Sequence, residues 1–151
     1  IVSQIRGRSH AQDIATRVDD TGVSRLSILA PPGELVYPDS TAVAVSPDGT
    51  MVAFVVGSVA RSENELWVRS LDSMTARRLE GTESAALPFW SPDSRFIAFS
   101  AAGTLMRFNL ATQTAQTIVD APAFEGGTWN RDSTILIGSS NAGRFKVASP
   151  G

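Results

Sequence analysis

The chain has 151 residues, of which 42% are hydrophobic, and its 13 basic and 15 acidic residues leave a formal net charge of −2 at pH 7. A chain of this length and apolar content can bury its own hydrophobic core, but its charge balance gives no electrostatic case for binding nucleic acid or an anionic membrane. Cysteine is absent, which excludes disulfides and thiolate chemistry, and no apolar run approaches the roughly 20 residues that a membrane-spanning helix needs. We therefore predict no nucleic-acid partner and no insertion of this chain into a membrane.

Two short segments precede the clearer pattern of the chain. Residues 1–22 are expected to form a linker or an extra hairpin strand, because residues 19–22 (DDTG) have the composition of a turn. Residues 24–29 alternate in part between polar and apolar side chains, which predicts a strand, and residues 30–33 (APPG) end it.

One turn sequence then occurs three times, each time between two short apolar runs. Proline at the second turn position presets φ, aspartate or serine tolerates the bent backbone, and glycine closes the turn without a side chain. We interpret these residues as a structural turn between two strands. The copies are Ser46-Pro47-Asp48-Gly49, Ser91-Pro92-Asp93-Ser94 and the degraded Asn130-Arg131-Asp132-Ser133.

The spacing of the turns predicts the architecture. The second copy begins 45 residues after the first and the third begins 39 residues after the second, and four-stranded propeller blades repeat at roughly 40 to 45 residues. Predicted strands lie at 42–46, 51–57, 65–71 and 76–79, at 87–91, 95–101, 104–110 and 115–119, and at 127–130, 134–139 and 144–148, with a polar loop at 58–64. The sequence therefore predicts an all-β chain with about three four-stranded antiparallel blades at about 41–80, 86–120 and 125–149, within a propeller part that spans 23–151.

Bulky apolar residues recur at matching positions of the three units. Aligning the turns places Val52 with Ile97 and Leu136, and Trp90 with Trp129 at the position before the turn. Blades that stack face to face need bulk at such positions, and we favour packing over a ligand-stacking role for the tryptophans. The residues predicted to pack between blades are Trp90, Trp129, Phe96, Phe54 and Phe99.

The turn sequence resembles that of the TolB-like propeller repeats over residues 24–148. Several segments, at 25–28 (RLSI), 30–33 (APPG), 66–72 (LWVRSLD), 79–83 (LEGTE), 88–93 (PFWSPD) and 127–130 (GTWN), resemble the C-terminal propellers of bacterial membrane-anchored serine/threonine protein kinases. In that family a cytoplasmic kinase domain precedes a transmembrane helix, and the propeller outside the membrane is a sensor or interaction domain. The resemblance implies an extracytoplasmic location, periplasmic or at the cell surface.

The predicted strands are too few for a closed ring. A propeller needs about four to eight blades, whereas this chain supplies two blades, three strands of a third and an early strand. We therefore expect a partial propeller or one completed by oligomerisation, because exposed apolar blade faces favour self-association. Residues 24–29 are the predicted sealing strand, which would complete the sheet at 127–148.

The sequence offers few arrangements of residues that could carry out catalysis. His10 is the sole histidine and no Gly-x-Ser-x-Gly elbow is present, so we predict no catalytic residues, and no metal or cofactor motif occurs. Asp48, Asp93 and Asp132 recur once per blade and could face a ligand or a hard cation, but an aspartate in a turn more often accepts bonds from its own backbone amides.

The function that these features favour is a non-catalytic recognition module. It would act as a sensor or scaffold that binds a protein, a peptide or a small ligand, as in the sensor domain of a bacterial serine/threonine kinase. One alternative is the gating propeller of a prolyl oligopeptidase type of serine hydrolase, whose chemistry lies in another domain. A second alternative is a structural unit whose activity is self-assembly.

Overall fold

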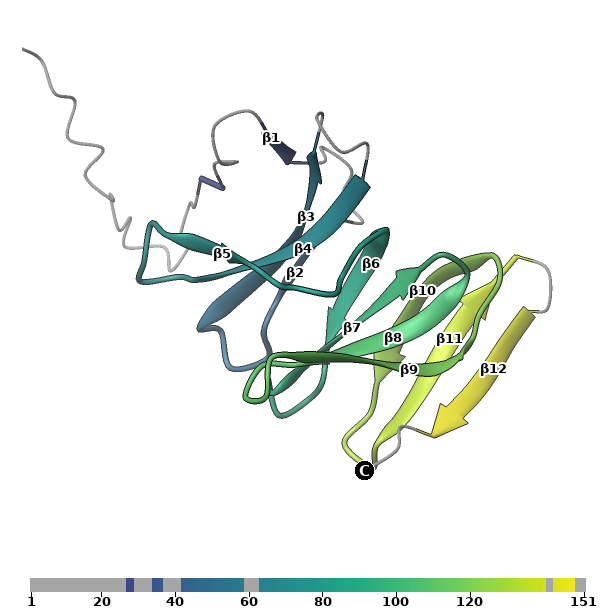
Figure 1. Ribbon diagram of the computed structural model, residues 1–151. Coiled ribbons are helices and arrows are strands. Elements are labelled where there is room, and N and C mark those ends of the chain that lie inside the picture. The colour runs from purple at the N-terminus through teal and green to yellow at the C-terminus, as the bar shows by residue number, and fades with distance from the viewer. Residues whose placement is uncertain (1–26, 29–33, 37–41, 59–62, 141–142, 149–151) are drawn as a thin grey trace, which may run out of the picture.

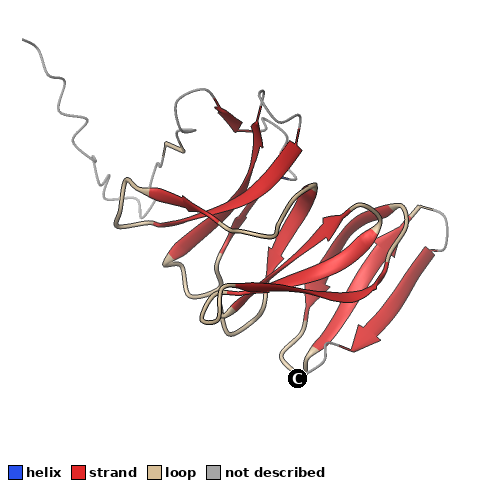
Figure 2. Cartoon of the chain, in the orientation of Figure 1, coloured by secondary structure: helices blue, strands red, loops and turns tan. Residues whose placement is uncertain are grey.

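The structure is a computed structural model that describes residues 27–28, 34–36, 42–58, 63–140 and 143–148 (Figure 1). Within these ranges the regular elements are strands, in three antiparallel sheets that follow one another across the molecule (Figure 2). The all-β prediction and the prediction of three blade-like sheets are therefore confirmed. The described residues include no helix long and apolar enough to cross a membrane.

Each sheet corresponds to one predicted unit. The first contains β1 (Glu34–Val36), β2 (Val43–Val45), β3 (Met51–Ser58), β4 (Glu63–Ser70) and β5 (Ala76–Arg78). The second contains β6 (Ala85–Trp90), β7 (Phe96–Ala101), β8 (Thr104–Asn109) and β9 (Thr114–Asp120), in that order. The third contains β10 (Phe124–Trp129), β11 (Thr134–Ser139) and β12 (Gly143–Ala148).

The first sheet differs from the prediction at both ends of β3. Strand β1, which the sequence analysis missed, pairs with the second half of β3, while β2 pairs with its first half. The two short strands therefore share one edge of β3 and together take the place of one inner strand. The predicted loop at 58–64 was too long, because Ser58 pairs with Glu63 and Gly57 pairs with Asn64.

The first two turns are closed by the same set of hydrogen bonds. In the first, the Ser46 hydroxyl donates to Asp48 Oδ1 at 2.6 Å and accepts the amide of Met51 at 2.9 Å. In the second, Ser91 donates to Asp93 Oδ1 at 2.6 Å and accepts the amide of Phe96 at 2.9 Å. The serine and aspartate therefore act as one unit that fixes the length of the loop.

The third turn is one residue shorter. The Ser46 amide donates to the carbonyl of Met51, five residues on, but the Asn130 amide donates to the carbonyl of Thr134, four residues on. Asparagine has no hydroxyl that could bridge the aspartate and the following strand as serine does. The tighter turn shifts the register of β11 by one residue.

This shift corrects the sequence alignment of the third unit. Trp90 pairs with Ile97, but Trp129 pairs with Ile135, which therefore replaces Leu136 as the equivalent of Ile97. A shift of one residue moves a strand's side chains to the opposite face of the sheet. Accordingly Ile135 is fully buried, whereas Leu136 is 42% exposed.

Two apolar clusters join the sheets. The first lies between the first and second sheets and includes Phe99 and Trp90. The second lies between the second and third sheets and includes Ile135 and Ile137, with Trp129 packed against it. Of the residues predicted to pack between blades, Phe99 and Trp90 lie in the first interface and Trp129 borders the second.

Phe54 lies on the other face of the first sheet. It is fully buried in a cluster with Val52 and Val56, against which Ile28 packs. The carbonyl of Ser27 accepts a hydrogen bond of 3.0 Å from Arg69 Nη1. Within the predicted sealing strand at 24–29, these two described residues are not in a strand and lie against the first sheet; the rest of that range and residues 1–22 lie outside the described residues.

We expect acid to weaken the first turn. Hydrogen bonds from the Ser46 hydroxyl, then from the Thr50 amide and hydroxyl, lower the pKa of Asp48 from 3.8 to about 2. Because the folded state has the lower pKa, this stabilisation is complete above about pH 4 and is lost as the pH falls through about 2. The stability difference between the wild type and Asp48→Asn, measured by urea denaturation, should therefore narrow from pH 4 to pH 2. A difference that stays constant with pH would contradict this account.

Backbone strain at the last turn position gives a second prediction. Gly49 and Ser133 both have positive φ, 70° and 63°, a conformation that costs L-residues roughly 1–2 kcal/mol. Ser133→Gly should raise the free energy of unfolding by a few tenths to about 1 kcal/mol after the entropy cost of glycine is subtracted. Gly49→Ala, which has open space for its methyl group, should lower it by about 1 kcal/mol. Chemical denaturation of both variants tests the pair, and a loss of stability in Ser133→Gly would be the opposite result.

Candidate functional site

Each of the three aspartates singled out in the sequence accepts a hydrogen bond from a backbone amide of its own turn. Oδ1 of Asp48 accepts the amide of Thr50, Asp93 that of Arg95, and Asp132 that of Thr134, at 3.0 to 3.1 Å. In the part of the chain that the structure describes, no group of three or more histidine, cysteine or acidic side chains is placed to hold a metal ion. The carboxylates therefore define the turns, and the candidate site lies beside them.

The two tryptophans before the second and third turns have different environments. Trp90 is 6% exposed, and its indole N–H donates to the carbonyl of Ala44 in the first sheet at 2.9 Å. Trp129 is only partly buried, and its ring lies 6.0 Å from that of Phe96, tilted by 34°. Its N–H donates to no group among the described residues. Equivalent positions thus contain one tryptophan that is bonded internally and one whose N–H has no partner within the described ranges.

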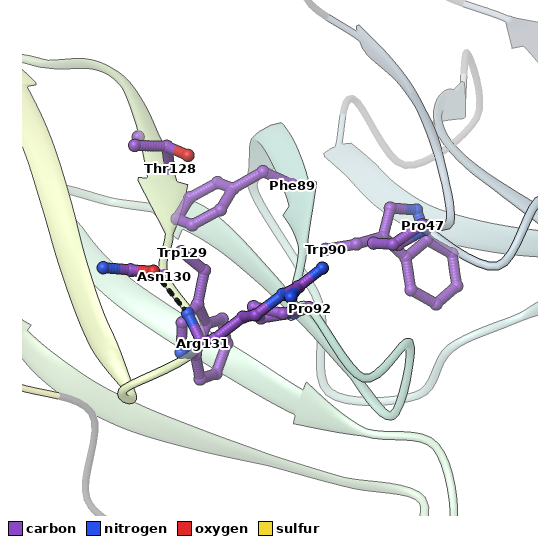
Figure 3. Close-up of a pocket in the computed structure, with 9 residues that line it drawn as sticks. Pro47, Phe89, Trp90, Pro92, Thr128, Trp129, Asn130 and Arg131 are labelled. Carbon is purple, nitrogen blue, oxygen red and sulfur yellow. Dashed lines mark hydrogen bonds between the residues drawn. The ribbon is translucent and has the colours of Figure 1, made fainter.

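Two adjoining pockets lie at the turn end of the second and third sheets. Both are lined by Pro92, Trp129, Asn130 and Arg131. The tryptophan pocket, of about 450 Å³, is completed by Pro47, Phe89, Trp90, Gly127 and Thr128 (Figure 3). The arginine pocket, of about 640 Å³, is completed by Ser91, Asp93, Arg95, Phe96, Arg107 and Ser133. Both volumes lie in the range of small-molecule and side-chain binding sites.

The tryptophan pocket is shaped by a close approach of two strands. The ring of Phe89 on β6 stacks on Phe124 with centroids 6.3 Å apart, and it also covers Gly127 on β10. A Cβ atom at Gly127 would lie 3.0 Å from the edge of the Phe89 ring. In Figure 3 the Arg131 side chain runs from the third turn past Pro92, on the side of the pocket opposite Phe89.

The arginine pocket carries an excess of positive charge. Its lining includes three guanidinium groups and one carboxylate, Asp93, whose Oδ1 already accepts two bonds within its turn. Arg107 lies over the Phe96 ring, 5.1 Å from its centroid, and donates to Gln116 Oε1 at 3.1 Å. Arg95 and Arg131 are exposed, and within the described residues neither side chain forms an ion pair.

The sequence analysis identified only part of this site. Trp129, Phe96 and the turn residues, which include Arg131, were singled out there, but no binding role was assigned to Arg95, Arg107 or Arg131. These arginines come from a turn, from β8 and from another turn, so no local sequence pattern connects them. The available signal was Arg131 itself, which occupies the position where the first two turns have proline.

A third pocket lies on the face of the last sheet that no described sheet covers. It has a volume of about 500 Å³ and is lined in part by Leu136, Gly126 and Gly138. Leu136 is one of the few large hydrophobic side chains exposed in the described part of the chain. An exposed apolar side chain of this kind is expected for self-association, and Val43 and Val45 of β2 in the first sheet are exposed as well.

Stacked antiparallel sheets with adjacent inner strands define blades of a β-propeller, and comparison with solved structures agrees. No family model matches the sequence, and no curated protein matches it. The propeller domain of the Trilobed protease from Pyrococcus furiosus is 26% identical over 64% of this chain and 32% of that one, with a TM-score of 0.52. TolB from Acinetobacter baumannii is 18% identical over 87% and 36%, with a TM-score of 0.56. An oligogalacturonate lyase in complex with manganese is 16% identical over 85% and 39%, with a TM-score of 0.67.

These likenesses establish the fold. The chain has β-propeller architecture, like that of TolB, and it spans less than two fifths of the length of each of the three proteins. A TolB protein, a protease domain and a lyase share this fold, so the fold does not select among activities.

The different environments of Trp90 and Trp129 predict different losses in the free energy of unfolding when each is substituted. Trp90→Phe removes a buried N–H donor and leaves the Ala44 carbonyl without it, so we expect a loss of about 1–3 kcal/mol in the free energy of unfolding. Trp129→Phe removes a donor that has no partner within the described residues and should cost less than about 1 kcal/mol. Urea denaturation of the two variants measures both values. Equal losses would show that Trp129 is as much a packing residue as Trp90.

Proposed function

We propose that the chain is a non-catalytic recognition module that binds a protein or peptide in the two adjoining pockets between the second and third blades. The observation that carries this proposal is Trp129. Its half-buried ring forms part of both pockets and its N–H has no described partner, whereas the equivalent Trp90 is bonded within the protein. A large aromatic ring with an available donor is a common anchor of protein interfaces.

The chemistry of the lining favours binding over catalysis. Prolines, aromatic rings and guanidinium groups provide apolar contact and fixed donors. The carboxylate of Asp93 accepts bonds from the Ser91 hydroxyl and the Arg95 amide, which hold it as part of the turn. The proposal therefore assigns the pockets to recognition.

The kind of protein that contains this module, and its location in the cell, are also part of the proposal. The resemblance of its segments to kinase propellers supports a role as the extracytoplasmic sensor domain of a bacterial serine/threonine kinase. The likeness in fold to TolB is consistent with a location outside the cytoplasm. We further propose that the ring is completed either by more blades of a longer chain or by association of copies, since Leu136 on the last sheet is exposed.

A second candidate is the gating propeller of a peptidase. The observation that favours it is the likeness to the propeller domain of the Trilobed protease, at 26% identity. The two candidates differ in the partner domain: a hydrolase domain with a nucleophile elbow would support the peptidase, and a kinase domain would support the sensor. The sequence of the complete gene distinguishes them.

A binding assay tests the recognition proposal. We expect the wild-type chain, applied to an array of immobilised peptides, to bind a subset of them, and Trp129→Phe to bind that subset at least about tenfold more weakly. Val45→Ala is the matched control, because Val45 precedes the first turn as Trp129 precedes the third and is 58% exposed away from both pockets. Binding that Trp129→Phe leaves unchanged, or a folded chain that binds no peptide, would contradict the proposal.

A further inference from the structure

The charge of the arginine pocket indicates the chemistry of its ligand. The chain as a whole carries a net charge of −2, yet this pocket gathers Arg95, Arg107 and Arg131 around a single carboxylate that its own turn engages. A concave surface of one sign concentrates ligands of the opposite sign. The pocket is therefore suited to an anionic group.

The arginines are arranged for recognition by geometry as well as by charge. Arg107 is fixed on two sides, by its bond to Gln116 and by the Phe96 ring beneath it, and the Phe96 ring lies in turn against Trp129. A guanidinium group held over an aromatic ring loses little further freedom when it binds an anion. Arginine also offers paired N–H groups that match the two oxygens of a carboxylate.

The tryptophan pocket places an apolar surface next to the positively charged arginine pocket. Pro47, Pro92, Phe89 and Trp129 line it, and it joins the arginine pocket along Trp129 and Arg131. A ligand that fills both pockets must present an apolar group beside an anionic one. An extended peptide does so with side chains two residues apart, which lie on the same side of its backbone.

We propose that the site binds an extended peptide in which a carboxylate neighbours an aromatic or large apolar side chain. The carboxylate binds Arg95 and Arg131 beside Arg107, and the apolar side chain enters the tryptophan pocket and packs on Trp129. This inference rests on the proposed recognition function and names its ligand class. The carboxylate can belong to an acidic side chain or to a peptide C-terminus.

Three sets of short peptides test the ligand class. The first set pairs phenylalanine with glutamate and has blocked ends, the second replaces glutamate with glutamine, and the third ends in phenylalanine with a free C-terminal carboxylate. We expect the first or the third set to bind at least about tenfold more tightly than the glutamine set in fluorescence anisotropy, and added salt to weaken that binding. Whichever of the two binds identifies the source of the carboxylate.

Substitutions link the binding to the pocket. Arg131→Gln should weaken binding of the acidic peptide by about tenfold and should leave the weak binding of the glutamine peptide unchanged. Arg77→Gln is the matched control, because Arg77 is an exposed arginine of the first sheet that lines neither pocket. Circular dichroism confirms that both variants remain folded.

The negative outcomes of these experiments separate the carboxylate inference from the recognition function. Equal affinity for the glutamate and glutamine peptides, with both weakened by Trp129→Phe, would overturn the carboxylate inference and leave the recognition function standing. No binding of any set by the folded chain would overturn both. A single-stranded oligonucleotide that binds as tightly as the acidic peptide and is equally sensitive to Arg131→Gln would show that the pocket takes polyanions without regard to the neighbouring apolar group, and it too would overturn the inference.

Discussion

The structure depends on the packing of apolar side chains of one sheet against those of the sheet before it. Ile97 and Phe99 of β7 lie in the same cluster as Ala53 of β3, and Ile135 and Ile137 of β11 lie in the same cluster as Ala98 of β7. Each interface removes apolar surface from water and so stabilises two sheets that would be marginal alone. Both pockets at the candidate site lie at the border of the second interface, so the same packing holds Trp129 and Phe96 in place.

The third turn links this packing to the candidate site. A shorter loop moves β11 by one residue, which brings Ile135 to the buried face. The same loop carries Arg131 where the other turns carry proline, and it follows a tryptophan whose N–H donates to no group in the described part of the chain. What looks in the sequence like a degraded copy of the turn is therefore the place where the third blade departs from pure repetition, and it is also where the pockets form.

The parts of the fold that follow from local chemistry could be predicted from the sequence. Proline and glycine in the turns and the runs of apolar residues beside them located the strands of all three sheets to within a few residues. Strand β1 was missed because the prolines around it suggest a break, and the register of β11 was wrong because an alignment on the turn sequence cannot reveal a turn one residue shorter. The arginine pocket could not be predicted, since Arg95 and Arg107 come from separate segments of the second sheet and Arg131 joins them only when the third sheet packs against it. For the residues of 24–29 other than Ser27 and Ile28, the sealing strand stays a prediction.

Leu136 distinguishes the exposed face of the third sheet from the equivalent faces of the first two sheets. The corrected register places it at the position of Ala53 and Ala98, the small residues against which the next sheet's bulky side chains pack. A sheet with the side chains of β7 or β11 that docked on the last sheet in the same way would meet a leucine there instead of an alanine. The third blade therefore presents a different surface at this position from the first two, and a further sheet packed on it needs room for the larger side chain.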